Sequence, residues 1–454
     1  MDEQHSIGSP AKKGSSRISR VRSASDEEIV EKTPHVQESL IKRTLKILGP
    51  GFITGASDDD PSGIGTYTAA GASLGFTTLW VALITFPLMV VVQFICAKVG
   101  MISGRGLAGI LKRYYSPWFL YPAIFALVLA NTINASADLG AIAAAINLLI
   151  PIPIAILVVP IALIILVLQI WGSYRLISNV FRWLTLALFA YLISVFFASP
   201  DWGNVLRGTF LPTLHLDSSY LATMVALLGT TISPYLFFWQ TSEEVEEEIK
   251  MGRKLLRQRK GATHSEIRHA LWDVNIGMFL SNLVMYAIIL ATASTLFKAG
   301  KHDVQSAIDA AQALRPLAGD AARILFAVGV IGSGFLAVPV LSGSAAYALS
   351  EAFGWKYGLE EKLGRAKRFY AIIIAITVVS LLMNYIGINP IQALFWAAVI
   401  NGVLAPPLLA FIMHIASRKE IMGNKVNGLV LNLIGWGTTL VMAVAAVAMF
   451  ITPH

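Results

Sequence analysis

Residues 57–63, with the sequence SDDDPSG, interrupt an otherwise apolar run that extends from residue 47 to residue 74. A second interruption, GTTISP at residues 229–234, lies within another apolar run, from residue 220 to residue 241. Proline and glycine break helices, so each run is predicted to form two half-helices around an unwound segment. The second run is the fifth predicted span after the first. Because five is odd, the two broken helices run in opposite directions, as an inverted repeat of two five-helix halves requires.

The composition indicates that these runs lie in a membrane. Of 454 residues, 56% are hydrophobic and 14% are charged, whereas soluble domains carry about a quarter charged residues. A soluble multidomain enzyme is therefore nearly excluded, and apolar stretches of about 20 residues predict transmembrane helices. We predict eleven helices, at residues 47–74, 78–99, 118–148, 152–171, 180–199, 220–241, 271–296, 321–349, 369–388, 391–415 and 428–451.

These spans predict the domain organisation of an all-α integral membrane protein. Residues 1–45 are polar, rich in Ser, and poor in aromatic residues, which predicts a disordered cytoplasmic tail. Residues 38–48 have the apolar spacing of a helix that lies along a membrane surface. Residues 46–219 form the first five-helix repeat, residues 220–415 the second, and residues 416–454 hold the eleventh helix. The tail lacks the apolar core of a signal peptide, so the first span is expected to direct membrane insertion.

The distribution of positive charge predicts the orientation in the membrane. With the amino terminus inside, only Arg207, Lys298, Lys301, Arg315 and Arg323 fall on the outer side, so 30 of the 35 Lys and Arg residues lie on the tail and inner loops. Cytoplasmic loops carry an excess of Lys and Arg. We therefore expect a multi-pass protein of the plasma membrane, or of the inner membrane in a bacterium, with the amino terminus cytoplasmic and the carboxyl terminus outside.

Three consecutive aspartates, residues 58–60, occupy the first interruption. One charged residue at the centre of a membrane helix costs roughly 2.5 to 3.5 kcal/mol, so these side chains must face protein, water or a cation. Pro61 removes a backbone donor and leaves nearby carbonyl oxygens without their helical partners. In the second interruption, Pro234 frees the carbonyl of Thr230 in the same way. Carboxylate, hydroxyl and carbonyl oxygens at one depth predict a cation site.

The alternative is that both interruptions are proline kinks, which are common in membrane helices. Kinks do not require negative charge, so the aspartates favour the cation site. Asp58 and Asp59 are open to a second interpretation, in which they line a hydrated vestibule or cap a half-helix. Asp60, directly before Pro61, is the residue that we expect to contact the ion.

At these residues the sequence resembles the NRAMP divalent-metal transporters, whose first helix carries Asp-Pro-Gly-Asn and whose sixth carries Met-Pro-His. The matching stretches are residues 60–63, DPSG, and residues 233–235, SPY, and the sequence GPG precedes the first helix at residues 49–51. The resemblance covers residues 40–450 and implies a LeuT-type inverted repeat that works by alternating access. Carried over position by position, it implies a metal-binding aspartate and two carbonyl donors, which are Asp60, Ser57 and Thr230.

The positions that set ion choice depart from the family pattern. Gly63 replaces the family asparagine, Ser233 the metal-binding methionine and Tyr235 the histidine, so the chain looks more like the divergent NRAMP-related magnesium transporters. Loss of the thioether favours Mg²⁺, Ca²⁺ and Mn²⁺ over softer ions. Mg²⁺ keeps several waters, which predicts a largely hydrated Mg²⁺ with few direct ligands. Mn²⁺ bound through carboxylate and carbonyls is the alternative, and Ca²⁺, which takes about six to eight oxygens, is less favoured. The candidate ligands are Asp60, Ser57, Thr230, Ser233, Asp59 and Gly63.

Proton coupling is expected to be weak or absent. The resemblance implies acidic residues on the third helix and a histidine on the sixth, whereas this chain has Asp138 with Ala135 on the third, and Tyr235 with Gln240 on the sixth. No side chain that titrates near neutral pH remains on the sixth helix. Asp138 is a candidate pathway residue, because acids within the membrane are usually functional. The alternative makes it a hydrogen-bond acceptor for Asn134 or Asn131, which precede it on the third helix.

Other polar residues carry weaker signals. Asn401 on the tenth helix is either a pathway residue or a bridge between helices. Asp273 is expected to cap the seventh helix, Glu351 to anchor a membrane boundary, and residues 243–248 to form a solvated helix. The single cysteine, Cys96, excludes an intrachain disulfide, and the scattered His residues do not predict a zinc site.

Three classes of function remain to be compared. The first is a secondary transporter of a hard divalent cation, with a proton-coupled Mn²⁺ or Fe²⁺ importer as its variant. The second is a sodium-coupled carrier of organic solutes on the same helical plan, which the three aspartates oppose if the solute is anionic. An intramembrane enzyme is disfavoured, because no catalytic motif is present. We expect no resident cofactor, no nucleic-acid partner, and a monomer in the lipid bilayer, with the metal ion as substrate.

Overall fold

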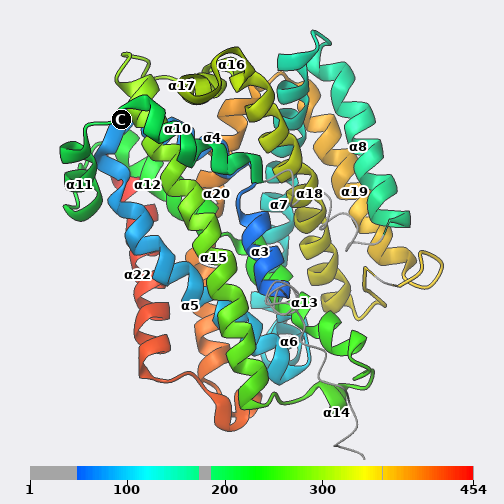
Figure 1. Ribbon diagram of the computed structural model, residues 1–454. Coiled ribbons are helices and arrows are strands. Elements are labelled where there is room, and N and C mark those ends of the chain that lie inside the picture. The colour runs from blue at the N-terminus through cyan, green and yellow to red at the C-terminus, as the bar shows by residue number, and fades with distance from the viewer. Residues whose placement is uncertain (1–48, 173–185, 360, 453–454) are drawn as a thin grey trace, which may run out of the picture. The chain divides into compact units, whose positions relative to one another are not determined.

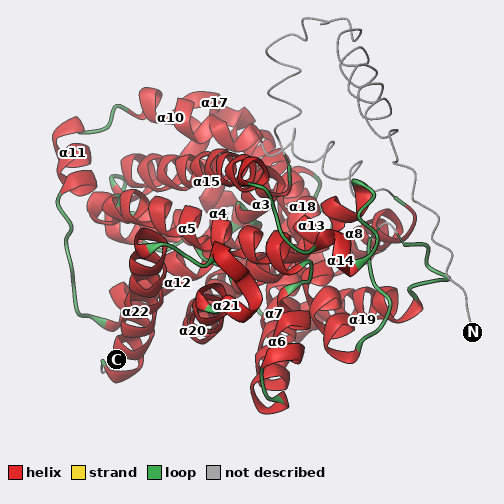
Figure 2. Cartoon of the chain, turned by 90° about the horizontal axis from the view of Figure 1, so that it is seen from below, coloured by secondary structure: helices red, strands yellow, loops and turns green. Residues whose placement is uncertain are grey.

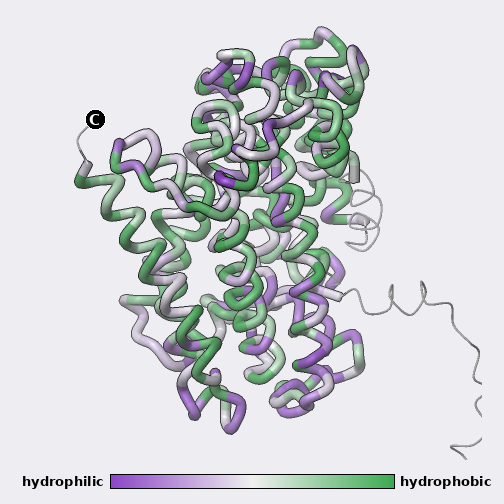
Figure 3. The backbone as a smooth tube through the Cα atoms, turned by 60° about the vertical axis from the view of Figure 1, so that its left-hand side comes forward, coloured by the Kyte–Doolittle hydropathy of each residue, from purple (hydrophilic) through white to green (hydrophobic). Residues whose placement is uncertain are grey.

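The computed structural model describes residues 49–172, 186–359 and 361–452 (Figure 1). The predicted tail, the predicted surface helix at residues 38–48, and the first residues of the span predicted at 180–199 lie outside these ranges. Within the described ranges the chain is helical, without a strand (Figure 2). Hydrophobic residues predominate in the middle of the helices, and hydrophilic residues gather toward their ends (Figure 3).

The α-helices have the following bounds: α3 Pro50–Asp58, α4 Pro61–Leu74, α5 Trp80–Ser103, α6 Leu107–Tyr114, α7 Pro117–Leu149, α8 Ile154–Trp171, α10 Ala190–Ala198, α11 Trp202–Phe210, α12 Ser218–Thr231, α13 Pro234–Lys250, α14 Leu256–Arg259, α15 His264–Thr292, α16 Ala307–Ala311, α17 Arg315–Ala318, α18 Ala322–Phe353, α19 Lys367–Met383, α20 Pro390–Ser417, α21 Lys419–Met422 and α22 Leu429–Ile451. Short 3₁₀ segments lie at Gly75–Thr78, Leu186–Phe189, Gln312–Leu314, Gly319–Ala321, Asn384–Ile386 and Gly423–Lys425, and a π-helical turn follows α15 at Ala293–Phe297.

The number of spans agrees with the sequence prediction. Within the described ranges, nine helical segments are long and apolar enough to cross a membrane. The broken first run, α3 and α4, and the shorter apolar helix at Ala187–Ala198 account for the other two. The largest differences from the predicted bounds are at α13, which continues to Lys250, and at α15, which begins at His264. A capping box formed by Thr263 and Glu266 places that earlier start.

Both predicted helix breaks are present. α3 ends at Asp58 and α4 begins at Pro61, while α12 ends at Thr231 and α13 begins at Pro234. Each proline occupies the first helical turn, where its missing N–H costs nothing. The first half of one broken helix packs against the second half of the other, α3 against α13 and α4 against α12. The two broken helices are therefore antiparallel, as an inverted repeat requires.

Small residues allow the helices around the breaks to approach closely. α12 packs on α20 at Gly229, where an added Cβ atom would lie 2.2 Å from the carbonyl oxygen of Ala398 and 2.3 Å from the backbone nitrogen of Gly402. Gly55 of α3 meets the backbone of Gly277 on α15 in the same manner. Such small-residue contacts replace the hydrophobic effect as a source of association between membrane helices.

Two carboxylates cap helices other than their own. Asp273 on α15 accepts hydrogen bonds from the backbone N–H groups of Gly49, Gly51 and Phe52, at 2.8, 2.7 and 3.2 Å. Asp273 therefore caps α3, and the prediction that it caps its own helix is wrong, because α15 starts at His264, about two and a half turns earlier. Glu351 near the end of α18 accepts from the N–H of Gly109 in the first turn of α6 at 2.9 Å. It is buried as a cap and does not act as a surface anchor.

The prediction of a solvated acidic helix at residues 243–248 is also wrong. Glu243, Glu244, Glu246 and Glu248 are all buried. This segment of α13 packs against α5 and α18, and that packing encloses the acidic side chains. Polar partners accompany them, since Gln240 donates to Glu244 at 2.9 Å and Arg253 pairs with Glu248 at 3.3 Å. Charge content alone could not distinguish this arrangement from an exposed face.

Candidate cation site

Asp60 stands at the centre of the first break. Its backbone is extended, with φ −68° and ψ 166°, so it forms the N-cap of α4. One carboxylate oxygen, Oδ1, accepts hydrogen bonds from the N–H of Gly63 at 2.7 Å and from the hydroxyl of Ser62 at 2.8 Å. Serine, aspartate and asparagine are preferred at this position because they satisfy the unpaired amides of the first turn. Capping therefore fixes the orientation of the carboxylate.

The other oxygen of Asp60, Oδ2, is directed toward neighbouring helices. It lies 3.1 Å from the side-chain nitrogen of Asn134 on α7 and 3.3 Å from the hydroxyl of Tyr235 on α13. The Tyr235 hydroxyl also lies 3.2 Å from the carbonyl oxygen of Ser57 at the end of α3. The two predicted ligands, Asp60 and Ser57, are thus brought together around one tyrosine hydroxyl. All four residues are buried.

The second break is arranged differently from the prediction. The Ser233 hydroxyl donates back to the carbonyl oxygens of Gly229 and Thr230, at 2.8 Å each. The carbonyls that Pro234 releases therefore have a partner within their own chain segment. The Thr230 hydroxyl, in contrast, is buried and has no hydrogen-bond partner in the described part of the chain. Thr230 faces the first break, since its hydroxyl would lie 3.1 Å from a Cβ atom added at Gly63.

Gly63 contributes space and a backbone amide to the site. A side chain at this position would press on Thr230 and on the ring of Tyr67, whose atoms would lie 3.3 Å from the added Cβ. The Gly63 N–H points at Asp60, so this residue orients the carboxylate as a donor. Gly63 lacks the side-chain amide that an asparagine would place here, and α4 and α12 are in direct contact.

Asp58 and Asp59 converge on a residue that the sequence did not indicate. The hydroxyl of Ser281 on α15 lies 2.6 Å from Asp58 Oδ2 and 3.1 Å from Asp59 Oδ1. Both carboxylates therefore point toward α15, while Asp60 points toward α7 and α13. Asp58 Oδ1 is buried without a partner in the described residues. Ser281 could not be predicted from the sequence, because nothing in the sequence specified which residue of α15 would face α3.

Asp138 lies next to the first break on α7. It is fully buried beside the backbone amide of Ser62, and neither carboxylate oxygen makes a hydrogen bond of ordinary geometry within the described chain. The alternative roles with Asn134 and Asn131 are not found. Asn134 donates to Asp60, and Asn131 donates to the carbonyl of Leu341 and the hydroxyl of Ser344. The Asp138 carboxylate is therefore not committed to Asn134 or Asn131.

Two further candidates form no hydrogen bond with this cluster in the described residues. Asn401 on α20 is buried, and its side-chain nitrogen has no partner among the described residues. Gln240 lies two turns along α13 from Ser233 and bonds to Glu244 instead of Asp60. The structure thus brings together Asp60, Ser57, Tyr235, Gly63 and Thr230, with Asp138 beside them. It does not bring Gln240 to the same place.

The chemistry of the cluster is that of oxygen ligands. Across the described residues, no group of three or more His, Cys, Asp or Glu side chains is arranged to hold a metal ion. The hydrogen bonds of Asp60 within the described chain come from amide and hydroxyl groups, and none comes from Lys or Arg. A cation that entered would therefore meet one carboxylate, hydroxyls, carbonyls and its own water.

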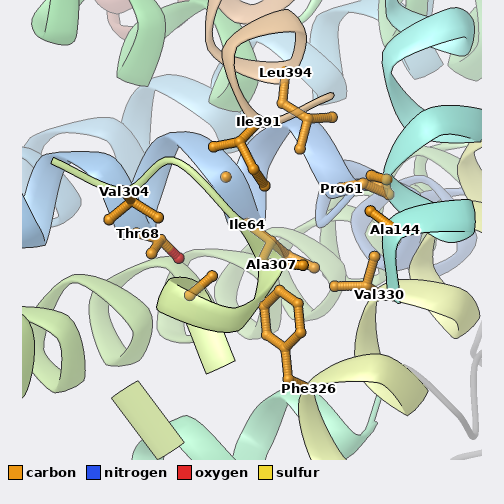
Figure 4. A pocket seen from close by; sticks show the side chains of 13 residues that line it. Pro61, Ile64, Thr68, Ala144, Val304, Ala307, Phe326, Val330, Ile391 and Leu394 are labelled. Atoms are coloured by element: carbon orange, nitrogen blue, oxygen red, sulfur yellow. The ribbon is translucent and has the colours of Figure 1, made fainter. Parts of the chain in front are cut away.

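An apolar layer separates the cluster from the end of the bundle that carries α16 and α17. A cavity of about 10 Å³ lies beyond Pro61, lined by side chains of α4, α7, α16, α18 and α20 (Figure 4). Ile391, Leu394, Val304, Phe326 and Val330 surround it. This volume holds about one water molecule. The approach from that end is therefore closed by packed hydrocarbon.

Comparison with known proteins supports the architecture. A family model described as Nramp, natural resistance-associated macrophage protein-like, matches residues 51–452. The chain is 27% identical over 389 residues to the "Divalent metal cation transporter MntH" of Mesorhizobium japonicum, covering 84% of this chain and 83% of that protein. It is 28% identical over 419 residues to the protein of the same name from Deinococcus radiodurans, covering 90% and 89%.

Solved structures show the same fold at lower identity. The Eremococcus coleocola manganese transporter, solved with an aromatic bis-isothiourea compound, superimposes with a TM-score of 0.71 at 21% identity, covering 90% of this chain and 87% of that one. Mhp1, a nucleobase-cation-symport-1 family transporter, superimposes with a TM-score of 0.56 at 14% identity, covering 89% and 92%. The predicted all-helical, LeuT-type fold is confirmed.

Proposed function

Because the chain belongs to the Nramp family, we propose that it is a secondary transporter of divalent metal cations, with Mg²⁺ as its main substrate. The metal is the transported substrate and not a resident cofactor. The observation that carries the proposal is the set of oxygen ligands at the two breaks, where Asp60, Ser57 and Thr230 present oxygen atoms. Oxygen ligands suit Mg²⁺, Ca²⁺ and Mn²⁺, whereas thioethers and thiolates select softer ions.

The small number of free protein ligands favours an ion that keeps its water. The Asp60 carboxylate and the Ser57 carbonyl, two of the groups that would line the ion, already share the Tyr235 hydroxyl. Ser233 is turned back onto its own helix. Mg²⁺ dehydrates reluctantly and is usually bound through one or two carboxylates with several waters retained. Asp60 supplies that carboxylate. This supports placing the chain in the magnesium-transporting branch of the family.

The second candidate is a Mn²⁺ or Fe²⁺ importer, and the relatives favour it through their names, which specify divalent metal cations and manganese. Uptake of Mg²⁺, Mn²⁺, Fe²⁺ and Ca²⁺ by purified protein in vesicles distinguishes the two. We expect Mg²⁺ uptake in the wild type, none in Asp60→Ala, and a shift toward Mn²⁺ in Ser233→Met. Unchanged preference in Ser233→Met would remove the argument from ligand softness.

We further propose that transport is driven by the membrane potential, with little or no proton coupling. Asp138 is the one acid on α7 beside the site, and Tyr235 and Gln240 stand where the family has histidines. A potential of 100 mV favours inward movement of a divalent ion by about twice 2.3 kcal/mol, so a second gradient is not needed for accumulation. Metal uptake by vesicles loaded with a pH indicator tests this. Robust acidification that follows the metal would overturn it.

The proposed orientation has the amino terminus inside and the carboxyl terminus outside. α14 and the basic segment around it lie at one end of the described bundle, and the end of α22 lies at the other (Figure 1). The excess of Lys and Arg near α14 supports assigning that end to the cytoplasm. Because Cys96 is buried, it should not interfere with labelling of single cysteines introduced in α14 or α17. A thiol reagent that does not cross the membrane is added outside intact cells, and only the cysteine in α17 should react. Labelling of α14 from outside would reverse the assignment.

We propose a monomer, which light scattering in detergent tests directly.

A further inference from the structure

A basic pocket lies at the α14 end of the bundle, away from the cation site. It has a volume of about 460 Å³ and lies between α6 and the segment that follows α18. Its lining contains three basic side chains and two aromatic ones, which are Arg105, Lys112, Arg113, Trp355 and Tyr357, together with Glu351 and two glycines. None of these residues takes part in the cluster around Asp60.

The pocket carries more positive charge than its one carboxylate can neutralise. No ion pair is present for Arg105, Lys112 or Arg113 among the described residues, where the ion pairs join other groups. The one carboxylate in the pocket, Glu351, already accepts the N–H of Gly109 at 2.9 Å and is buried against α6. A carboxylate that caps a helix is committed to the backbone amides of that helix. The remaining cationic groups are therefore open to an external anion.

Aromatic side chains place the mouth of the pocket at a membrane surface. Trp355 lines the pocket and stacks on Phe353, with ring centroids 4.9 Å apart and an interplanar angle of 17°. Phe353 lies 5.9 Å from the ring of Tyr121 on α7, and Arg368 lies 5.1 Å above the ring of Trp355. Trp and Tyr with nearby basic residues are typical of the level of lipid headgroups.

An exposed apolar stripe on α7 leads away from this mouth. Tyr121, Phe125 and Leu129 are 47%, 70% and 49% exposed. They are spaced four residues apart, so they lie on one face of the helix, one turn after another. This face runs from the aromatic rim toward the middle of the predicted span. A soluble anion would make no contact with these apolar side chains, whereas the acyl chain of a lipid would cover them.

We propose that this pocket binds the phosphate headgroup of an anionic phospholipid, with one acyl chain lying along α7. The guanidinium groups of Arg105 and Arg113 and the ammonium of Lys112 supply charge-assisted hydrogen bonds to phosphate oxygens. Basic pockets between membrane helices on the cytoplasmic side are suited to such headgroups. A bound lipid would add a further link between α6 and the end of α18, which already pack together and share the Glu351 cap. The proposal does not depend on which ion is transported.

The test compares lipids and matched charge variants of the full chain. The variant Lys112→Gln/Arg113→Gln removes two charges from the pocket, and Arg257→Gln/Lys260→Gln removes two exposed charges from α14 and the residue after it, at the same end of the bundle. Retention of phosphatidylglycerol and phosphatidylcholine is measured by native mass spectrometry. Each basic residue near an anionic lipid strengthens binding about five-fold. Loss of two such residues should therefore weaken phosphatidylglycerol retention roughly 30-fold in the pocket variant. The control variant should match the wild type.

Further arms separate the alternatives. Inorganic phosphate and glycerol 3-phosphate should not raise the melting temperature of the wild type, and a rise equal to that given by phosphatidylglycerol would mean a soluble ligand. Equal loss of retention in the two double variants would mean general attraction of the basic surface and would overturn the site. If the double variant does not fold, Lys112→Gln gives the same comparison, because this side chain is exposed. Substitution of the apolar stripe by Phe125→Ser should weaken phosphatidylglycerol retention without changing the charge, and no change would remove the acyl-chain contact.

Discussion

Replacement of Asp60 by asparagine tests the proposed cation site while keeping the local fold. The new side chain has the same shape, and its oxygen can keep the hydrogen bonds to the Gly63 amide and the Ser62 hydroxyl. Its nitrogen would face the side-chain nitrogen of Asn134, so that hydrogen bond of 3.1 Å is lost. The Tyr235 hydroxyl, 3.3 Å away, can instead accept from the new nitrogen while it donates to the carbonyl of Ser57. The lost bond is worth about 0.5 to 1.5 kcal/mol, and removal of a buried charge offsets part of that loss. The metal-free protein should therefore remain folded.

The effect on the ion should be much larger. At an effective dielectric constant of about 20, two unit charges 4 Å apart interact with about 4 kcal/mol, hence about 8 kcal/mol for a divalent ion and one carboxylate. Water displaced from the ion offsets part of this attraction. If only about 3 kcal/mol remains, the affinity still falls more than 100-fold. The substitution should thus separate ion binding from folding.

Thermal unfolding in detergent measures both quantities in one experiment. At a Mg²⁺ concentration about 100 times the dissociation constant, the wild type gains about 2.7 kcal/mol, whereas a variant bound 100-fold more weakly gains about 0.4 kcal/mol. Asp217→Asn is the matched control. Asp217 caps α12 with the same local pattern, accepting from the N–H of Tyr220 at 2.9 Å and from the hydroxyl of Ser219 at 2.7 Å. It lies outside the site, and its variant should respond to Mg²⁺ like the wild type.

Three outcomes would contradict the reasoning. Asp60→Asn that retains the full Mg²⁺ stabilisation and uptake would show that the ion binds elsewhere. A loss of Mg²⁺ response in Asp217→Asn as large as that in Asp60→Asn would show that capping, and not ligation, is responsible. A low melting temperature without metal in Asp60→Asn alone would contradict the expected small cost of the lost hydrogen bond.

Three further substitutions test the packing around the site. Tyr235→Phe removes two long hydrogen bonds and should lower the free energy of unfolding by about 1 kcal/mol, with Mg²⁺ uptake retained; abolished uptake would make the hydroxyl a required ligand. Asp273→Ala leaves three amides at the start of α3 without a partner, so hydrogen exchange at Gly51 should accelerate at least about ten-fold. Unchanged exchange would exclude the cap. Gly229→Val places a Cβ atom 2.2 Å from a backbone oxygen and should prevent folding, measured as lost monodisperse protein in detergent, whereas Gly437→Ala, with nothing within 4 Å, should not.

Helix breaks could be predicted because their cause is local. Pro61 and Pro234 lack an N–H and fix their own backbone angle, whatever surrounds them. The capping role of Asp60 is local as well, since the amide and the hydroxyl that donate hydrogen bonds to it lie within three residues. The spans follow from composition, because a membrane helix must be apolar over its whole length.

Partners across the bundle could not be predicted in the same way. Ser281 meets Asp58 and Asp59 across more than two hundred residues, and Asn134 reaches Asp60 across seventy-four. The alternative that paired Asn134 with Asp138 was reasonable by spacing and is not what occurs. A side chain on a helix can turn to several neighbours, and only the packed arrangement decides which one is within reach.

The sequence by itself determined two antiparallel broken helices, the number of spans, and the carboxylate that stands at the first break. The tertiary structure decided that Ser233 satisfies its own helix, that residues 243–248 are enclosed, and that Asp273 and Glu351 cap distant helices. The division has one physical reason. Helix formation and its interruption depend on hydrogen bonds four residues apart, whereas burial and satisfaction of a polar side chain depend on which helix packs against it.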